Sequence, residues 1–178
     1  MVQRTFLRSE EIKGKLNHMA IKVDNISLND LIKQSETSPR KRAATPLHPY
    51  EKEGTRAILN CIQPESYARP HLHPSAHNAS EIWVPIQGRI AAITFDVNGN
   101  LREVNYISRK NPQDCIYLEI MPDTYHTAIS LEPNSIMLEF SRGPYNPDTY
   151  KAFANWAPPE EEIEMAVQYL RYLESKLK

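Results

Sequence analysis

Residues 70–88 read PHLHPSAHNASEIWVPIQG, and this stretch carries most of the chemical information in the chain. His71 and His73 are two residues apart, so both imidazoles project to the same side if the segment is an extended strand. Two imidazoles on one side of a strand have the geometry to coordinate one metal ion. The stretch therefore offers two candidate metal ligands on one side of an extended segment, then a polar loop, then a predicted strand that begins at Glu81 and ends before Gly88.

Glu81 and His126 are the candidates for completing a metal site. Glu81 opens the second strand, and His126 directly follows the turn formed by residues 122–125. A carboxylate and several imidazoles from separate strands can enclose a divalent first-row metal and leave one or two positions open to a substrate. The alternative is a set of surface histidines on a polar loop, and spacing alone favours neither.

Short β-type runs separated by turn residues continue from about Thr55 to Ser141. Eight strands at this spacing predict an all-β sandwich or barrel over residues 54–142. The pair Asn98-Gly99 favours a tight hairpin between two of them. The predicted strands cover residues 56–63, 66–69, 81–87, 89–96, 101–107, 114–121, 127–131 and 136–141.

Residues 1–53 and 143–178 lie outside this pattern. The first region is polar and irregular, and predicts an arm with one short helix from Ser27, as its cap, to Gln34, followed by an extended proline-rich segment. The second region leads into a predicted helix from Glu160 to Lys178, packed on the barrel. Its apolar residues at helical spacing are Ile163, Val167, Leu170, Leu173 and Leu177.

The composition fits one soluble globular domain of 178 residues and excludes several partners. Its 21 basic side chains are balanced by 22 acidic ones, so no electrostatic field favours nucleic acid. The chain contains no glycine-rich fingerprint for a dinucleotide or a phosphate. It also lacks an apolar run of signal-peptide or membrane-spanning length, which predicts a cytoplasmic protein without a membrane partner. Cys61 and Cys115 are predicted to be buried, reduced thiols.

These motifs resemble the two signatures of the cupin superfamily of double-stranded β-helix barrels. The resemblance is carried by His71-x-His73, by Glu81 with six residues to Gly88, and by Pro122 followed four residues later by His126. It implies a barrel of two antiparallel sheets, with the arm and the C-terminal helix outside it. It also implies one metal inside the barrel, held by the two histidines, the glutamate and the later histidine.

The spacing departs from the cupin pattern at one point. Cupins usually place about three or four residues between the second histidine and the glutamate, whereas seven intervene here, residues 74–80. His77 lies nearer the usual glutamate position, so it can replace or join Glu81. The distance from Glu81 to Gly88 and its place at a strand start favour Glu81.

A closer resemblance, from about Arg40 to Pro159, is to the WbuC-type cupin-fold metalloproteins. The matching runs are Leu47-His48 and residues 66–73, 95–99, 143–145 and 153–158. That family is associated with bacterial surface-polysaccharide gene clusters, so the resemblance implies a sugar phosphate or nucleotide sugar as the small-molecule substrate. The Asn that usually precedes the Leu-His pair is Pro46 in this chain.

Six further residues are candidates for catalysis or for substrate binding. Tyr125, Glu119 and His48 are the candidate acids or bases near the metal. The candidate substrate ligands are Arg56, Arg69 and Tyr117, and the two arginines suit a carboxylate or a phosphate. Five of the six also have a structural alternative: packing for Tyr125, pairing with a nearby Arg or Lys for Glu119 and Tyr117, and surface ion pairs for the two arginines.

The leading hypothesis is a sugar or sugar-nucleotide isomerase or epimerase that depends on one divalent metal, Fe, Mn, Ni or Zn, as a Lewis acid. An Fe(II) dioxygenase is the enzymatic alternative, because the same ligands leave room for O₂. A third hypothesis is a non-catalytic cupin that only binds or senses a small molecule. A metal-free epimerase with a histidine base is the fourth. The cupin resemblance also implies a homodimer, because cupins commonly pair through their outer sheets.

Overall fold

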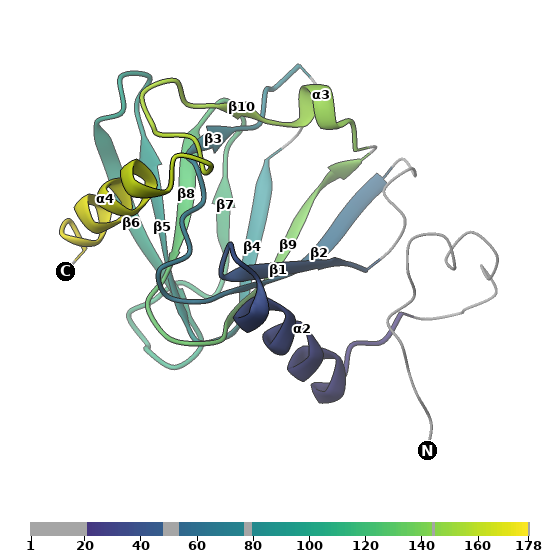
Figure 1. Ribbon diagram of the computed structural model, residues 1–178. Helices are drawn as coiled ribbons and strands as arrows, with labels where there is room; N and C mark the ends of the chain where they lie inside the picture. The colour runs from purple at the N-terminus through teal and green to yellow at the C-terminus, as the bar shows by residue number, and fades with distance from the viewer. Residues whose placement is uncertain (1–20, 48–53, 77–79, 144, 178) are drawn as a thin grey trace.

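Two antiparallel five-stranded sheets face each other in the computed structural model, which describes residues 21–47, 54–76, 80–143 and 145–177 (Figure 1). Sheet A has the strand order β1-β2-β9-β4-β7, and sheet B has the order β10-β3-β8-β5-β6. The all-β prediction is therefore confirmed. The strands are β1 (Arg42–Pro46), β2 (Gly54–Ile62), β3 (His71–Leu72), β4 (Glu81–Gln87), β5 (Arg89–Phe95), β6 (Leu101–Ser108), β7 (Leu118–Ile120), β8 (Tyr125–Ser130), β9 (Ser135–Gly143) and β10 (Ala152–Phe153).

Three helices lie outside the sheets in the described part of the chain: α2 (Asn25–Thr37), α3 (Pro147–Tyr150) and α4 (Ile163–Glu174). In Figure 1, α2 lies along β1 and α4 lies on the outer face of sheet B. The buried face of α4 consists of Ala166, Leu170 and Leu173. None of the helices in the described ranges has the length and apolar character needed to cross a membrane.

Both long helices differ in their ends from the sequence prediction. The Asp24 carboxylate, and not Ser27, caps α2, because it accepts a hydrogen bond from the Ser27 backbone N–H at 2.9 Å. The C-terminal helix begins at Ile163, after Glu160, because the Glu160 carboxylate instead binds the Arg42 guanidinium in a bidentate ion pair at 2.7 and 2.8 Å. Within α4, the predicted stripe residue Ile163 is 72% exposed.

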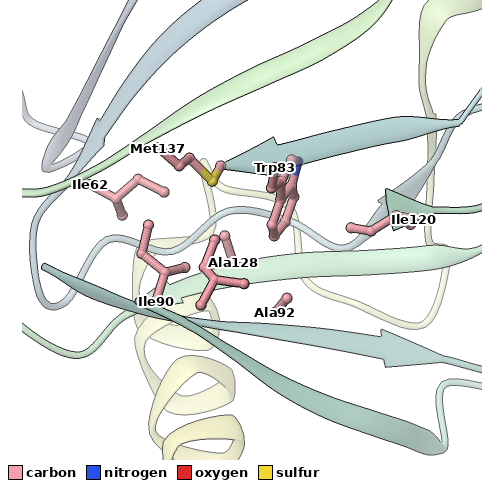
Figure 2. Close-up of a cluster of buried hydrophobic side chains, with 8 residues drawn as sticks. Ile62, Trp83, Ile90, Ala92, Ile120, Ala128 and Met137 are labelled. Atoms are coloured by element: carbon pink, nitrogen blue, oxygen red, sulfur yellow. The ribbon is translucent and has the colours of Figure 1, made fainter. Parts of the chain in front are cut away.

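Alternating side chains of both sheets meet in an apolar core (Figure 2). Trp83 on β4 and Met137 on β9 come from sheet A, and they face Ile90 and Ala92 on β5 of sheet B. Complete burial of a side chain such as Ile90 contributes about 1.5–3 kcal/mol to the free energy of unfolding. This core occupies one end of the space between the sheets.

The inward-facing rows become polar toward the other end of the barrel. On β9 the row that begins with Met137 continues with Glu139 and Ser141, all of them buried. On β8 the residue two before the core residue Ala128 is His126. Because strand side chains alternate with a period of two, these polar groups point into the same interior as the apolar core.

One predicted strand is absent, another is shorter than expected, and three observed strands, β1, β3 and β10, lie outside the predicted runs. Residues 66–69 form no strand, because side chains bind their carbonyl oxygens: Arg42 donates to Tyr67 at 2.6 Å and Thr127 donates to Ala68 at 2.7 Å. Only Leu118–Ile120 of the predicted run 114–121 is a strand. The proline-rich segment contains β1, which was predicted only as extended chain, and the two-residue β10 has no pattern of its own. Both cysteines are free, with Cys61 buried and Cys115 half-buried.

Replacement of Gly88 by Ala is expected to destabilise the fold. Gly88 has a φ of +73°, and an added Cβ would lie 2.8 Å from the Ser135 Cα. Gly54→Ala is the matched control, because Gly54 has a φ of +112° but no atom within 4 Å of the added Cβ. We expect Gly54→Ala to cost about 1–2 kcal/mol in free energy of unfolding, and Gly88→Ala about 1–3 kcal/mol more. Urea denaturation measures both, and equal losses would contradict the steric argument.

Candidate functional site

Three histidines meet at the polar end of the barrel. His71 on β3 lies directly opposite His126 on β8 in the strand register, and His73 follows two residues after His71. Their ring centroids are 4.6 Å apart for His71 and His126, 5.2 Å for His71 and His73, and 5.5 Å for His73 and His126. One nitrogen from each ring lies within 4.8 Å of the other two, and all three residues are buried.

A backbone carbonyl oxygen faces the Nδ1 atom of each ring. The distances are 3.1 Å from His71 to Arg69 O, 2.8 Å from His73 to Tyr150 O, and 2.9 Å from His126 to Thr124 O. A carbonyl oxygen only accepts hydrogen bonds, so each neutral imidazole carries its proton on Nδ1. The Nε2 atoms are then left with lone pairs, as in imidazoles that ligate a metal.

Glu81 adds an oxygen from the opposite sheet. Its Oε2 atom lies 3.0 Å from His126 Nε2 and 3.2 Å from His73 Nε2. Within the described residues, these three buried atoms have no hydrogen-bond partner. Oε2 can accept a hydrogen bond from either Nε2 atom when that nitrogen carries a proton. When both nitrogens carry lone pairs instead, they and the carboxylate oxygen repel one another at such distances unless a cation lies among them. Three nitrogens and one oxygen suit Zn, Fe, Mn or Ni, so the donors fit a divalent transition metal.

The charges at the site follow from burial and from close neighbours. Burial lowers the pKa of His71 well below its usual value, and the charge of Lys151 acts in the same direction. Burial alone would raise the pKa of Glu81, but hydrogen bonds and positive charge from His126 and His73 in their protonated forms outweigh burial and hold that pKa well below its usual value. A bound cation would favour the ionised carboxylate further. His71 is therefore neutral and Glu81 negative at neutral pH.

Glu139 on β9 is a functional candidate that the sequence analysis missed. It lies within side-chain hydrogen-bonding reach of Glu81, and it accepts a hydrogen bond from Asn60 Nδ2 at 2.9 Å. Burial, followed by the negative charge of Glu81, raises the pKa of Glu139 well above its usual value. Two carboxyl groups in contact share one proton, so Glu139 is the neutral member of the pair. Its only signal in the sequence is its place two residues after Met137, in the inward row of β9.

Three candidates from the sequence lie on other faces of the molecule. Glu119 pairs in register with Ile82, so it points outward where Glu81 and Ile120 point inward. On that exposed face Glu119 accepts a hydrogen bond from the Tyr117 hydroxyl at 2.8 Å. Tyr125 precedes His126 and faces the opposite way, with its ring 5.7 Å from the ring of Trp156. Tyr125 thus packs against an aromatic ring, whereas Glu119 and Tyr117 pair with each other and not with the Arg or Lys considered from the sequence.

The two candidate arginines lie in different places. Arg69 donates to the Ala154 carbonyl at 2.8 Å and borders a groove of about 370 Å³ together with Arg40, Phe153, Glu160 and Glu161. Arg56 is buried at the polar end of the barrel, where its Nη1 atom donates to Ser141 Oγ at 3.3 Å. His48 and His77 lie outside the described residues.

Comparisons with known proteins agree with this architecture. A family model described as a domain of unknown function (DUF6016) matches residues 23–107. None of the curated proteins matches the chain. Among solved structures, protein SO0799 from Shewanella oneidensis is 11% identical, with a TM-score of 0.57 over 82% of this chain and 94% of its own.

Two further solved structures are similar over part of the chain. The capsular polysaccharide assembling protein CapF from Staphylococcus aureus is 14% identical, with a TM-score of 0.53 over 66% of this chain and 32% of its own. KdgF from Halomonas sp. is 19% identical, with a TM-score of 0.46 over 63% of this chain and 87% of its own. At these identities the likeness concerns the fold alone. The likeness to protein SO0799 and to CapF, together with the paired antiparallel sheets, shows that the chain has the cupin fold.

Proposed function

We propose that this chain is a metal-dependent enzyme in which His71, His73, Glu81 and His126 hold one divalent first-row transition metal. The observation that carries the proposal is a buried cluster of one ring nitrogen from each of three histidines, with a Glu81 carboxylate oxygen 3.0 Å from His126 Nε2 and 3.2 Å from His73 Nε2. The pattern of unpartnered atoms at His73, His126 and Glu81 supports it, because buried polar groups are otherwise paired. Solvated surface histidines, the alternative from the sequence, would be exposed.

The surroundings of the four donors favour an enzyme over a purely structural metal site. Four protein donors leave one or two positions open on a first-row metal that takes five or six ligands. Glu139, a titratable group that is not one of the donors, lies beside Glu81. An open position next to a group that can hold a proton is typical of metal enzymes, and a metal held only for stability needs neither.

The proposed substrate is a small polar metabolite, a sugar or sugar nucleotide of surface-polysaccharide biosynthesis. What supports this choice is the resemblance of residues 66–73 and 153–158 to the WbuC-type proteins. The likeness to CapF concerns the fold and adds no evidence on the substrate. The homodimer implied by the cupin resemblance is part of the same proposal.

Isomerisation or epimerisation is the proposed reaction. The ion, when bound, supplies Lewis acidity that lowers the cost of removing a proton from a carbon beside a carbonyl. Glu139 holds a proton in contact with Glu81, and the apolar side chains of Trp83 and Ile120 exclude water on the core side. A proton that moves between neighbouring carbons requires no oxidant, so the chain needs no further redox group for this reaction.

Loss of the Glu81 carboxylate is expected to remove the metal. Glu81→Gln keeps the size of the side chain but presents a neutral amide to the ion. We expect the wild type, purified without added metal, to contain about one equivalent, and the variant to bind at least about 100-fold more weakly. Elemental analysis and a metal titration measure both.

Glu119→Gln is the matched control for Glu81→Gln. It removes a carboxylate from the neighbouring strand, on the outward face, and should leave the metal content unchanged. His77→Ala tests the remaining alternative from the sequence and should also retain the metal. Equal metal content in the Glu81 and Glu119 variants would contradict the proposed ligand set.

Glu139→Gln is expected to keep the stability and the metal affinity of the wild type, whereas Glu139→Leu is expected to lower the stability. A Gln amide can accept from Asn60 and donate to Glu81, so it reproduces both contacts of a neutral carboxyl group. Leu leaves both partners unpaired, at a cost of about 1–3 kcal/mol in free energy of unfolding. Chemical denaturation and metal titration compare the two variants. If Gln were as damaging as Leu, the neutral state assigned to Glu139 would be wrong.

A deuterium experiment tests the reaction class. The metal-loaded protein is incubated with a panel of sugar phosphates and nucleotide sugars in D₂O, with dissolved oxygen monitored in parallel. An isomerase or epimerase is expected to incorporate deuterium at carbon without consuming O₂. Oxygen consumption that depends on Fe(II) would instead indicate the dioxygenase, and binding without exchange or oxygen uptake would indicate a non-catalytic cupin.

A further inference from the structure

The segment from Tyr145 to Tyr150 contacts the candidate metal site through its last residue. The Tyr150 carbonyl oxygen accepts the hydrogen bond from His73 Nδ1 at 2.8 Å. The Tyr150 ring also packs on the His73 ring, with the centroids 4.5 Å apart and the planes at 56°. Both side chains are nearly fully buried, at 3% and 4% exposed. The position of Tyr150 therefore sets the direction in which His73 Nε2 points.

The secondary-structure elements around Tyr150 are too short to hold its carbonyl group in place by themselves. Helix α3 has four residues and β10, which follows it, has two. A single helical turn is not stable in isolation, because nucleation costs more than its few hydrogen bonds return. Contacts with the barrel must therefore fix Tyr150.

Arg56 on β2 provides such contacts. Its guanidinium carbon lies 4.5 Å from the ring centroid of Tyr150 and 4.7 Å from that of Tyr145. The two rings themselves pack edge to face at 5.0 Å. Arg56 is 3% exposed, and a cation–π contact is strongest where the cation is removed from water.

Ser141 ties these groups to the rigid part of the barrel. Its Oγ accepts hydrogen bonds from the Tyr150 hydroxyl at 3.0 Å and from Arg56 Nη1 at 3.3 Å. Ser141 and Arg56 are direct partners in the register of β9 and β2. Burial raises the pKa of Tyr150, which keeps its hydroxyl protonated as a donor. Arg56 and Ser141 therefore contact Tyr150 from two long, paired strands, β2 and β9.

We infer that Arg56 is a positioning residue for the metal ligand His73, and that it acts through Tyr150. This inference rests on the proposed metal site. Arg56 packs on the rings of Tyr145 and Tyr150 and so fixes the position of Tyr150. The Tyr150 carbonyl oxygen then fixes the tautomer and orientation of His73. Metal binding and the docking of residues 145–150 are therefore coupled, and each strengthens the other.

The test compares Co²⁺ binding by Arg56→Met, Arg56→Lys and the wild type. Met fills similar volume without charge, and we expect about 10-fold or greater loss of affinity together with altered visible absorption bands of the bound Co²⁺. Lys keeps a cation over the rings but lacks the planar guanidinium, so it should restore part of the loss. Arg89→Met is the matched control, because it removes an arginine that lies 4.2 Å over the ring of Tyr106, on a different strand.

The Tyr150→Phe variant and amide hydrogen exchange provide a second test if Arg56→Met folds poorly. Tyr150→Phe retains the ring and the carbonyl but loses the hydrogen bond to Ser141, and should weaken Co²⁺ binding a few-fold. In the wild type, Co²⁺ should slow amide hydrogen exchange in residues 145–151, and it should do so less in either variant.

The outcomes separate this inference from the proposed function. Arg56 and Tyr150 variants that bind Co²⁺ with wild-type affinity and spectrum would overturn the positioning role while leaving the metal site intact. A wild-type protein that binds no Co²⁺ would overturn both. Weaker, spectrally altered binding in the Arg56 variant, with Arg89→Met unchanged, would support the inference.

Discussion

Three main-chain carbonyls govern the candidate site, because each receives the Nδ1 proton of one histidine. They belong to Arg69 before β3, to Thr124 before β8 and to Tyr150 at the end of α3. Each imidazole could otherwise rotate and present either nitrogen to the interior. With the Nδ1 protons committed to the backbone, the Nε2 atoms are left as the possible metal donors, one nitrogen of each ring lies within 4.8 Å of the other two, and the site is as rigid as the chain segments around it.

The two ends of the barrel interior differ in chemistry: one is apolar and the other is polar. The end lined by Ile90, Ile107 and Met137 excludes water and contributes much of the folding free energy. The other end places Glu81 and Glu139 beside three imidazoles, an arrangement that costs several kcal/mol when no cation compensates it. Such groups persist in a protein when another part of the structure supplies the stability. The separation of the two ends thus permits a destabilising cluster of buried polar and charged groups inside a stable fold.

Sequence periodicity predicted those parts of the site that depend on side-chain spacing. The two-residue spacing predicted that the His71 and His73 rings turn to the same side, and their centroids lie 5.2 Å apart, although β3 ends at Leu72 and His73 follows it. Glu81 starts a strand whose inward row continues with the core residue Trp83. Glu119 could not be placed in this way, because one residue of register on the short edge strand β7 decides whether it or Ile120 points inward. Every residue has a backbone carbonyl, so the sequence cannot indicate which one accepts a hydrogen bond from a histidine. The role of Tyr150 is therefore visible only in the structure.

The C-terminal extension is part of the site and not only a cover for the barrel. Strand β3 contains two residues and meets β8 at one register pair, so it needs support on its other side. Residues 150–154 give that support: Phe153 pairs with His71, and the Ala154 N–H donates to the Pro70 carbonyl at 2.9 Å. The extension is in turn held to the barrel where the ring of Trp156 packs against Gly99. Without residues 150–154, β3, which carries His71 and leads directly into His73, would therefore have no fixed partner on its outer edge.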